Sequence, residues 1–492
     1  MITLKKIRTL ALAAAAGAGL LAAPGALRAD TDSASGGGGT TPSSTIETLR
    51  NQIAELDEKL RILERKQENA DETNAAAFKA IPSIKADDKG LTVESRDKSY
   101  QFRLRGLLQT DYRGYLDIEQ NKSAAAANNP DQNDGFVLRR VRPRFQGKLW
   151  ENLTFEFTPE LTWSNNTNNV RIIDTWANYR FLDELNFKAG LFKTPVGLER
   201  FQSGAATLFP ERGLSTNLVA TRDLGAEING VTWDKQLTYR LGLFNGAVDS
   251  DDARGNANLD EGVDVAAGIF VEPFKNNGPT WVQGLGFGVA GSIGDNDGPF
   301  TGQGRLRYRS GGQDSFFDTN TANFVFDGEH YRINPQIYYY NGPWGFLGEY
   351  IYSSLDFARA NNPGQTGTIE TSAWTAQLSY VVTGEDASFT GVKPLKPFSL
   401  KEGGGFGAVE LGARVGSVAI DGDAFRPIGG AVLAATGSAD ETLAYGGVVN
   451  WYLNTNVKFQ LSYEHTAYNG YLGGAGDRPD EDVITGRFQV SF

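Results

Sequence analysis

The chain has 492 residues, a formal net charge of −12 at pH 7 and no cysteine. The absence of cysteine excludes disulfide bonds and thiol catalysis, and the acidic balance argues against a nucleic-acid partner, because nucleic acids bind basic surfaces. The two histidines, His330 and His465, stand alone in the sequence, with neither a metal-ligand spacing nor a nucleophile–base pattern. We therefore expect no enzyme activity, no metal and no cofactor.

Residues 1–29 have the pattern of a secretory signal peptide. A basic start that contains Lys5, Lys6 and Arg8 precedes an apolar stretch, and the small residue Ala29 ends the segment. The alternative, a permanent membrane anchor, is less favoured because the apolar stretch is short and rich in Ala and Gly. The pattern therefore predicts export.

Two linkers and a helix are expected before the main domain. Residues 30–44 are rich in Gly, Ser and Thr and should form a flexible linker, and the polar, charged and Ala-rich residues 69–98 should form a second one. Between them, residues 45–68 place apolar side chains at alternating spacings of three and four, which predicts a short coiled coil. These positions are Ile46, Leu49, Ile53, Leu56, Leu60 and Leu63. A lone amphipathic helix packed on the protein is the alternative.

From residue 99 to residue 492 the apolar pattern has a period of two, which is the period of a β-strand. In LRRVRPRFQGKLW, residues 138–150, basic and apolar side chains alternate, so a strand would separate a cationic face from an apolar one. We expect about sixteen such strands. They lie near residues 99–112, 136–149, 152–163, 170–181, 185–193, 223–233, 236–246, 262–273, 281–292, 330–341, 344–356, 370–383, 405–415, 442–453, 456–467 and 482–492.

The links between these strands differ in length in a regular way. Links after odd-numbered strands are mostly long, for example 194–222 and 357–369, and links after even-numbered strands are mostly short, with 384–404 as the clear exception. A soluble sandwich has no reason to segregate its loops, whereas an outer-membrane barrel does so. We therefore predict an all-β fold: a transmembrane antiparallel β-barrel in the outer membrane of a Gram-negative bacterium, closed by the strand that ends at Phe492.

In such a barrel the apolar parity faces lipid and the charged parity lines a water-filled interior. Eight cations are candidates for a pore-lining anion track, because rings of Arg or Lys attract anions and guanidinium groups match oxyanions. They are Arg103, Arg105, Arg140, Arg142, Arg144, Lys148, Lys188 and Lys193. The alternative is a neutralised wall, since Glu156 and Glu160 on the third strand should lie close to the arginines of the second.

Several segments along the barrel carry a family resemblance. They are GLFKTPVGLE (190–199), RDLGAEING (222–230), INPQIYYYNGPWGFLGEY (333–350), WTAQLSYVVTGE (374–385) and NWYLNTNVKFQLSYEHT (450–466). Together they resemble the phosphate-selective porin O and P family. The resemblance implies a sixteen-stranded barrel that assembles as a homotrimer, in which inward-folded loops narrow each pore.

The resemblance also implies roles for particular residues. The link 194–222 would be the constriction loop, with Lys193 at its root, and the arginine row on the second strand is similar to the arginine ladder of the family. Members of the family also use a lysine cluster at the constriction. Here Lys393, Lys396 and Lys401 lie in the link 384–404, which is placed either in the lumen or on the periplasmic side.

We therefore expect an outer-membrane channel for the passive diffusion of small inorganic anions, with phosphate or related oxyanions favoured. A general non-selective porin with a neutralised wall is the first alternative. The second is a barrel that anchors an envelope tether, with the coiled coil in the periplasm and in contact with peptidoglycan. Outer-membrane lipid and lipopolysaccharide are the expected surroundings of the barrel.

Overall fold

The computed structural model describes residues 42–116, 133–164, 167–250, 262–299, 305–401, 403–470, 472–474 and 476–492. The chain divides into two units, residues 1–76 and 77–492, which we describe separately. The expected signal peptide, residues 1–29, and all but the last three residues of the linker 30–44 lie outside the described residues.

Helix α1 spans Pro42–Ala80. Its stripe of leucine and isoleucine side chains, from Ile46 to Leu63, is more than half exposed at every predicted coiled-coil position, so the coiled coil itself stays a prediction. The helix runs twelve residues past residue 68 because the segment is rich in Ala, the best helix former. The range 69–98 thus holds the end of α1 and a hairpin. No helix among the described residues has the length and apolar composition needed to cross a membrane.

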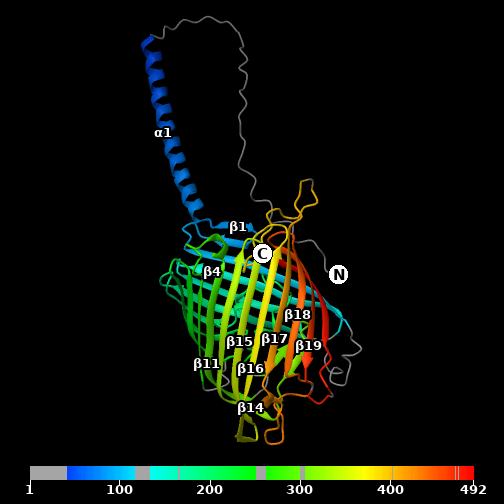
Figure 1. Ribbon diagram of the computed structural model, residues 1–492. Coiled ribbons are helices and arrows are strands. Elements are labelled where there is room, and N and C mark those ends of the chain that lie inside the picture. Colours follow the sequence, from blue (N-terminus) through cyan, green and yellow to red (C-terminus); the bar gives the residue numbers. More distant parts are fainter. Residues whose placement is uncertain are drawn as a thin grey trace, which may run out of the picture. The chain divides into compact units, whose positions relative to one another are not determined.

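The second unit is a closed antiparallel barrel of sixteen strands in the described residues (Figure 1). They are β3 (Tyr100–Leu116), β4 (Gly135–Leu149), β5 (Leu153–Ser164), β6 (Thr167–Arg180), β7 (Asn186–Phe192), β8 (Asp223–Thr232), β9 (Leu237–Phe244), β10 (Asp264–Val271), β11 (Leu285–Pro299), β14 (Phe324–Asn341), β15 (Trp344–Arg359), β16 (Asn362–Val381), β17 (Ala408–Ile420), β18 (Glu441–Tyr452), β19 (Val457–Asn469) and β20 (Glu481–Ser491). The predicted fold class is confirmed, and each of these strands overlaps one of the sixteen predicted ranges.

The barrel closes where β20 pairs with the second half of β3, from Leu107 to Leu116. The terminal residue completes this seam, because Phe492 N donates to Gly106 O over 3.0 Å and Gly106 N donates to Phe492 O over 2.8 Å. The first half of β3 pairs instead with the hairpin of β1 (Ser83–Asp87) and β2 (Gly90–Glu94). The hairpin therefore continues the sheet where the C-terminal strand stops (Figure 1).

The barrel has polar side chains inside and apolar side chains outside. On β14, Arg332 and Asn334 point inward and are buried, whereas Ile333 and Ile337 point outward with 52% and 41% of their surface exposed. An exposed apolar belt over a polar interior is the reverse of a soluble protein and is the pattern of a barrel in lipid. The predicted assignment of the two faces is confirmed.

The links are mostly long at one end of the barrel and mostly short at the other, and two of the departures from this pattern bear on the predictions. The predicted long link 357–369 is wrong, because β15 and β16 continue until Arg359 pairs with Asn362. The strand-favouring residues Thr366, Thr368 and Ile369 extend this pairing beyond the predicted boundary. The link between β16 and β17, residues 382–407, is long at the short-turn end, as predicted.

The link between β7 and β8, residues 193–222, is here called the inner loop. It contains α3 (Leu198–Phe201) and the 3₁₀ turn η3 (Leu214–Leu218). Leu214, Leu218 and Val219 are buried in an apolar cluster with side chains of β15 and of the link between β11 and β14, which carries the small β12 (Arg307–Arg309) and β13 (Ser315–Asp318). Burial of each such side chain contributes about 1.5–3 kcal/mol, so the inner loop has a core of its own.

Candidate functional site

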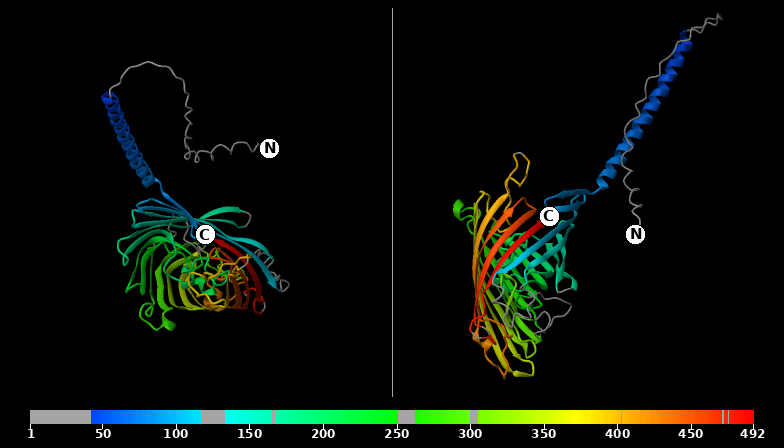
Figure 2. Two further views of the ribbon diagram at one scale, coloured as in Figure 1. Left: turned by 90° about the horizontal axis from the view of Figure 1, so that it is seen from above. Right: turned by 90° about the vertical axis from the view of Figure 1, so that its right-hand side faces the viewer.

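The inner loop lies inside the barrel, where it is fastened to the inward face of the wall (Figure 2, left). Glu349 of β15 accepts hydrogen bonds from Leu198 N over 2.6 Å and from Ser215 Oγ over 2.9 Å. This carboxylate holds both short helices of the loop, since each contributes a donor that no bond within the helix uses.

Backbone carbonyl groups of the inner loop are fastened to the stretch of wall that follows β15, on β17, β19 and β20. Arg414 of β17 donates to Glu211 O over 2.7 Å, Lys458 of β19 to Thr207 O over 3.2 Å, and Gln489 of β20 to Ala205 O over 3.0 Å. Polar side chains inside the barrel thus satisfy a loop backbone that would otherwise be buried without partners.

A cavity of about 1350 Å³ remains beside the inner loop. Its wall is formed mainly by β3–β7 and β9, and residues of β18–β20 and of several links complete it. Twenty of its lining residues are Lys or Arg, and five are Asp or Glu. The acids are Asp88, Glu156, Glu160, Asp174 and Glu211. The cavity is therefore strongly cationic although the whole chain is acidic.

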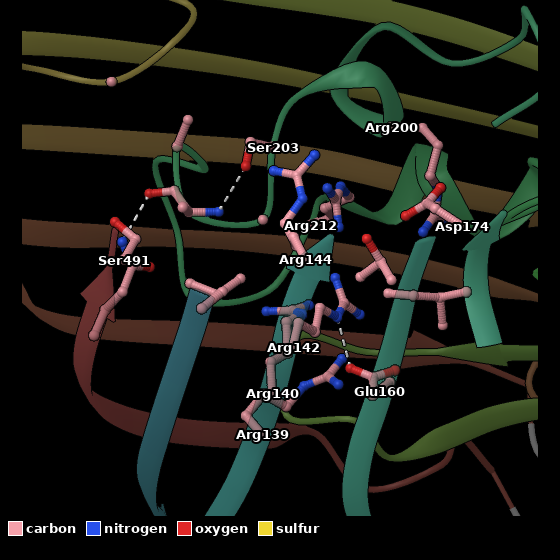
Figure 3. A pocket seen from close by; sticks show the side chains of 18 of the residues that line it. Arg139, Arg140, Arg142, Arg144, Glu160, Asp174, Arg200, Ser203, Arg212 and Ser491 are labelled. Carbon is pink, nitrogen blue, oxygen red and sulfur yellow. Dashed lines mark hydrogen bonds and ion pairs between the residues drawn. The ribbon is translucent and has the colours of Figure 1, made fainter. Parts of the chain in front are cut away.

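Two arginines of β4 are paired with acids of the next strand, and Figure 3 shows the pair of Arg142 with Glu160. Arg144 Nη2 lies 2.8 Å from Glu156 Oε1, and Arg142 Nε lies 2.8 Å from Glu160 Oε1. Glu160 also binds Arg171 of β6, with 3.1 Å between Nη2 and Oε2. In this part of the wall each arginine is in direct contact with a carboxylate that neutralises its charge. This arrangement is the one expected for a wall of paired charges, the alternative to an anion track.

Glu211 of the inner loop is the meeting point of four arginines. Its carboxylate oxygens lie 2.9 Å from Arg139 Nη2, 3.1 Å from Arg487 Nη2, 3.4 Å from Arg113 Nη2 and 3.6 Å from Arg140 Nη2. Burial raises the pKa of Glu211, but the surrounding guanidinium groups outweigh burial and hold that pKa well below its usual range. Asp111 of β3 also binds Arg487 over 2.6 Å and lies 3.8 Å from Arg113. Two carboxylates thus serve four guanidinium groups, which leaves a cationic excess beside the loop.

Cations of the inner loop bind neutral oxygens. Lys193 Nζ donates to Phe201 O over 3.3 Å and to Gln202 O over 3.0 Å. Arg212 donates from Nε to Glu199 O over 3.1 Å and from Nη2 to Gln202 O over 2.8 Å. Among the described residues neither Lys193 nor Arg212 has a carboxylate oxygen within 4.0 Å, so their charges are fixed in place without being cancelled.

The electrostatics of Lys193 follow from this arrangement. Burial, together with the positive charges of Arg212 and Arg222, lowers the pKa of Lys193 well below its ordinary value of 10.5. Arg222, at the end of the inner loop, forms two 3.1 Å contacts with the carboxylate of Asp174. The loop cations therefore repel one another, and an anion entering the cavity would relieve that repulsion.

Comparisons with known proteins agree with this geometry. The family model described as "Phosphate-selective porin O and P" matches residues 102–492. The chain belongs to the phosphate-selective porin O and P family. As a porin of this family it is a channel of the Gram-negative outer membrane and not an enzyme.

Similar proteins include Porin O of Pseudomonas aeruginosa, which is 24% identical over 431 residues, covering 82% of this chain and 91% of that protein. Among solved structures, the outer-membrane channel DcaP of Acinetobacter baumannii is 10% identical with a TM-score of 0.50 and covers 81% of this chain and 99% of its own. An anion-selective porin from Comamonas acidovorans is 12% identical with a TM-score of 0.47, over 80% of this chain and all of its own.

Of the eight cations predicted to line this porin, seven line the cavity. Lys148, near the end of β4, is not among the lining residues that the structure describes. The link 384–404 lies partly in the lumen and partly outside it, so each of the two placements considered for it holds for part of the link. Lys393 lines the cavity, and Gln202 of the inner loop donates to Phe389 O over 2.9 Å. Lys396 and Lys401 are exposed outside the cavity.

Sequence reasoning missed several charged residues of the porin lumen. Arg171 and Arg240 lie on strands, where the inward parity of their neighbours could have revealed them. Arg200, Arg212 and Glu211 lie in the inner loop, where no period of two applies. Their positions depend on how the loop folds against the wall, and the sequence carries no local signal for that.

Proposed function

We propose that this porin conducts small anions in preference to cations, with phosphate and related oxyanions as its preferred substrates. The observation that carries this proposal is the excess of twenty cations over five acids around the cavity. Because water-filled constrictions with low-dielectric walls concentrate the oppositely charged ion, such an excess favours anions on entry.

The donor chemistry supports oxyanions in particular. Guanidinium groups present planar pairs of N–H donors that match two oxygens of a phosphate or carboxylate. The eight residues predicted as an anion track remain part of the proposal, and Arg200, Arg212 and Arg240 are added to it. Lys193 and Arg212 are its centre, since both bind only neutral oxygens among the described residues.

A general diffusion porin is the second candidate, and a specific observation favours it. Arg142, Arg144 and Arg171 each contact a glutamate on β5. If ion pairs of this kind dominate the field in the lumen, the wall is close to neutral and discriminates little between ions.

Planar-bilayer recordings decide between the two candidates. We expect reversal potentials in a KCl gradient to show anion selectivity, and added phosphate to reduce the chloride current. The double variant Arg142→Glu/Arg144→Glu should lose both properties, whereas Arg426→Glu, a change on an exposed link outside the cavity, should keep them. A wild-type channel without ion selectivity, indifferent to phosphate, would identify a general porin.

We also propose a homotrimer with a signal peptide at residues 1–29 and a periplasmic coiled coil at residues 45–68. The exposed apolar stripe of α1 supports self-association, and assembled barrels would raise the local concentration of the helices. Lipopolysaccharide around the barrel and a peptidoglycan contact of the helix belong to the same proposal. Cross-linking of detergent-extracted protein should give trimers. A product that stops at dimers, or no product, would refute the trimer.

A further inference from the structure

One lumen cation is held by aromatic rings although an acid stands opposite it. Lys188 of β7 is paired in register with Glu227 of β8, so an ion pair would be the ordinary outcome. The ammonium Nζ instead lies 4.1 Å from the ring centre of Phe192 and 4.4 Å from that of Trp176. Glu227 accepts a 3.2 Å hydrogen bond from Asn229 Nδ2, and no ion pair within 4.0 Å joins it to Lys188 in the described structure.

The strand sequence explains how the rings come together. Lys188, Gly190 and Phe192 share the inward parity of β7, and Trp176 of β6 is paired with Gly190. Gly190 has a φ of 129°, and a Cβ there would stand 2.7 Å from Trp176 Cα and 2.2 Å from Thr175 O. Because only glycine accepts this conformation and approach, the two strands come close and the indole packs beside Phe192.

A second aromatic-held cation lies two strands along the same wall, because β8 pairs with β7 on one side and with β9 on the other. Arg240 of β9 places its guanidinium carbon 4.4 Å from the ring centre of Phe201, in α3 of the inner loop. The carbonyl of Phe201 accepts the bond from Lys193. Phe201 thus contacts one cation with its ring and another with its backbone, and it joins the inner loop to the wall.

Trp176, Lys188, Phe201 and Arg240 all line the cavity and are partly exposed to it. At the wall of β4, an anion meets guanidinium groups that are already bound to carboxylates. In this region it meets cations that lie beside apolar rings. Charged groups next to aromatic surface are poorly hydrated and suit an anion whose own charge is attached to an apolar body.

We propose that Lys188, Arg240, Trp176 and Phe201 form a subsite for organic anions with an aromatic body, such as aryl sulfonates and aryl carboxylates. The anionic group binds the ammonium and the guanidinium, and the aryl ring packs against the indole and phenyl groups. This inference rests on the proposed anion channel and extends its substrates beyond inorganic oxyanions. Glu227 opposes the subsite, because its Oε2 has no hydrogen-bond partner among the described residues and repels anions.

The test compares two anions that share a head group. Benzenesulfonate and methanesulfonate are titrated separately against the KCl current of the purified full-length porin in planar bilayers. We expect benzenesulfonate to block at a concentration roughly tenfold lower, which corresponds to one good aromatic contact. Trp176→Leu and Phe201→Leu should each bring the two blocking concentrations together by weakening only benzenesulfonate, and Glu227→Gln should tighten both anions.

Matched controls separate the ring effect from charge and from folding. Arg103→Gln removes one lining cation on β3, away from these rings, and should leave the ratio of the two blocking concentrations unchanged. Trp374→Leu removes an exposed, outward-facing indole on β16 and should also leave it unchanged. Heat-modifiable migration in detergent gels verifies that each barrel is folded, and Trp176→Phe, which keeps a ring, should retain the preference.

The results that would overturn the aromatic subsite differ from those that would overturn the anion channel. Equal block by both anions in the wild type, or a ratio that survives in both Leu variants, would overturn the aromatic subsite and leave anion selectivity in KCl untouched. A channel that shows no anion selectivity in KCl would overturn the proposed function itself, independently of the two sulfonates.

Discussion

Replacement of Lys193 and Arg212 by glutamine should lower the chloride-over-potassium permeability ratio by roughly tenfold. In a water-like dielectric, a unit positive charge about 6 Å from a passing ion attracts chloride and repels potassium by about 0.7 kcal/mol each. Screening by salt at about 0.1 M roughly halves this difference, so each cation removed should lower the permeability ratio roughly threefold. Both side chains donate to carbonyl oxygens of the inner loop and not to carboxylates, so no negative charge is released when they are lost. Reversal potentials in a KCl gradient measure the change.

The matched control removes an ion pair from the opposite wall. Arg144→Gln with Glu156→Gln deletes one positive and one negative charge that lie 2.8 Å apart, so the net charge of the lumen is unchanged and the permeability ratio should hardly move. If the permeability ratio fell equally in this control and in the loop variant, the assignment of selectivity to the inner loop would be contradicted.

Dependence on pH gives the same prediction a second readout. Because burial and neighbouring arginines lower the pKa of Lys193, the amine loses its proton at a lower pH than a free lysine. Anion selectivity of the wild type should therefore fall as the pH rises through that lowered pKa. Lys193→Arg keeps its charge at alkaline pH and should show a flatter profile.

The barrel could be predicted from the sequence because strand periodicity is a local property. The inward arginines Arg140, Arg142 and Arg144 of β4 follow from the period of two, and the predicted proximity of Glu160 to Arg142 is borne out by their 2.8 Å contact. Arg139 departs from this period because the pairing of β3 with β4 shifts register beside it. The boundary between β15 and β16 differs from the prediction because the backbone pairing of the two strands continues through residues 357–369, where the apolar alternation of the sequence fades.

The balance of charge in the lumen could not be predicted, for a different reason. It depends on contacts between residues far apart in the sequence, such as Arg414 with Glu211 O and Gln202 with Phe389 O. These contacts form only once the inner loop has folded against the wall. The sequence therefore indicated a cationic row that includes Arg142 and Arg144 and, as the alternative, its neutralisation by Glu156 and Glu160, without deciding between them. The structure pairs both arginines with these acids.

Asp111→Ala should destabilise the barrel by about 3–5 kcal/mol, the cost of leaving a buried charge without its partner. Asp111 of β3 and Arg487 of β20 are paired in register at the closing seam, and both side chains are fully buried. Their carboxylate and guanidinium groups form two contacts of 2.6 Å. Loss of the carboxylate would leave the guanidinium with Glu211, which three other arginines share, as its remaining acidic partner among the described residues. Urea denaturation followed by heat-modifiable migration measures the loss.

The double variant Asp111→Leu/Arg487→Leu separates the seam from the loop. Replacing both partners of a buried pair by apolar groups of similar size is often close to neutral for stability, so the double variant should unfold much nearer to the wild type than Asp111→Ala does. Arg487 also binds Glu211 over 3.1 Å and donates to Pro210 O, and these contacts are lost in the double variant. A stable barrel with a larger, less selective conductance is therefore expected, because the seam closes without the pair while the inner loop loses one of its ties to the wall. If the double variant were as unstable as Asp111→Ala, the ion pair itself would be needed for barrel closure.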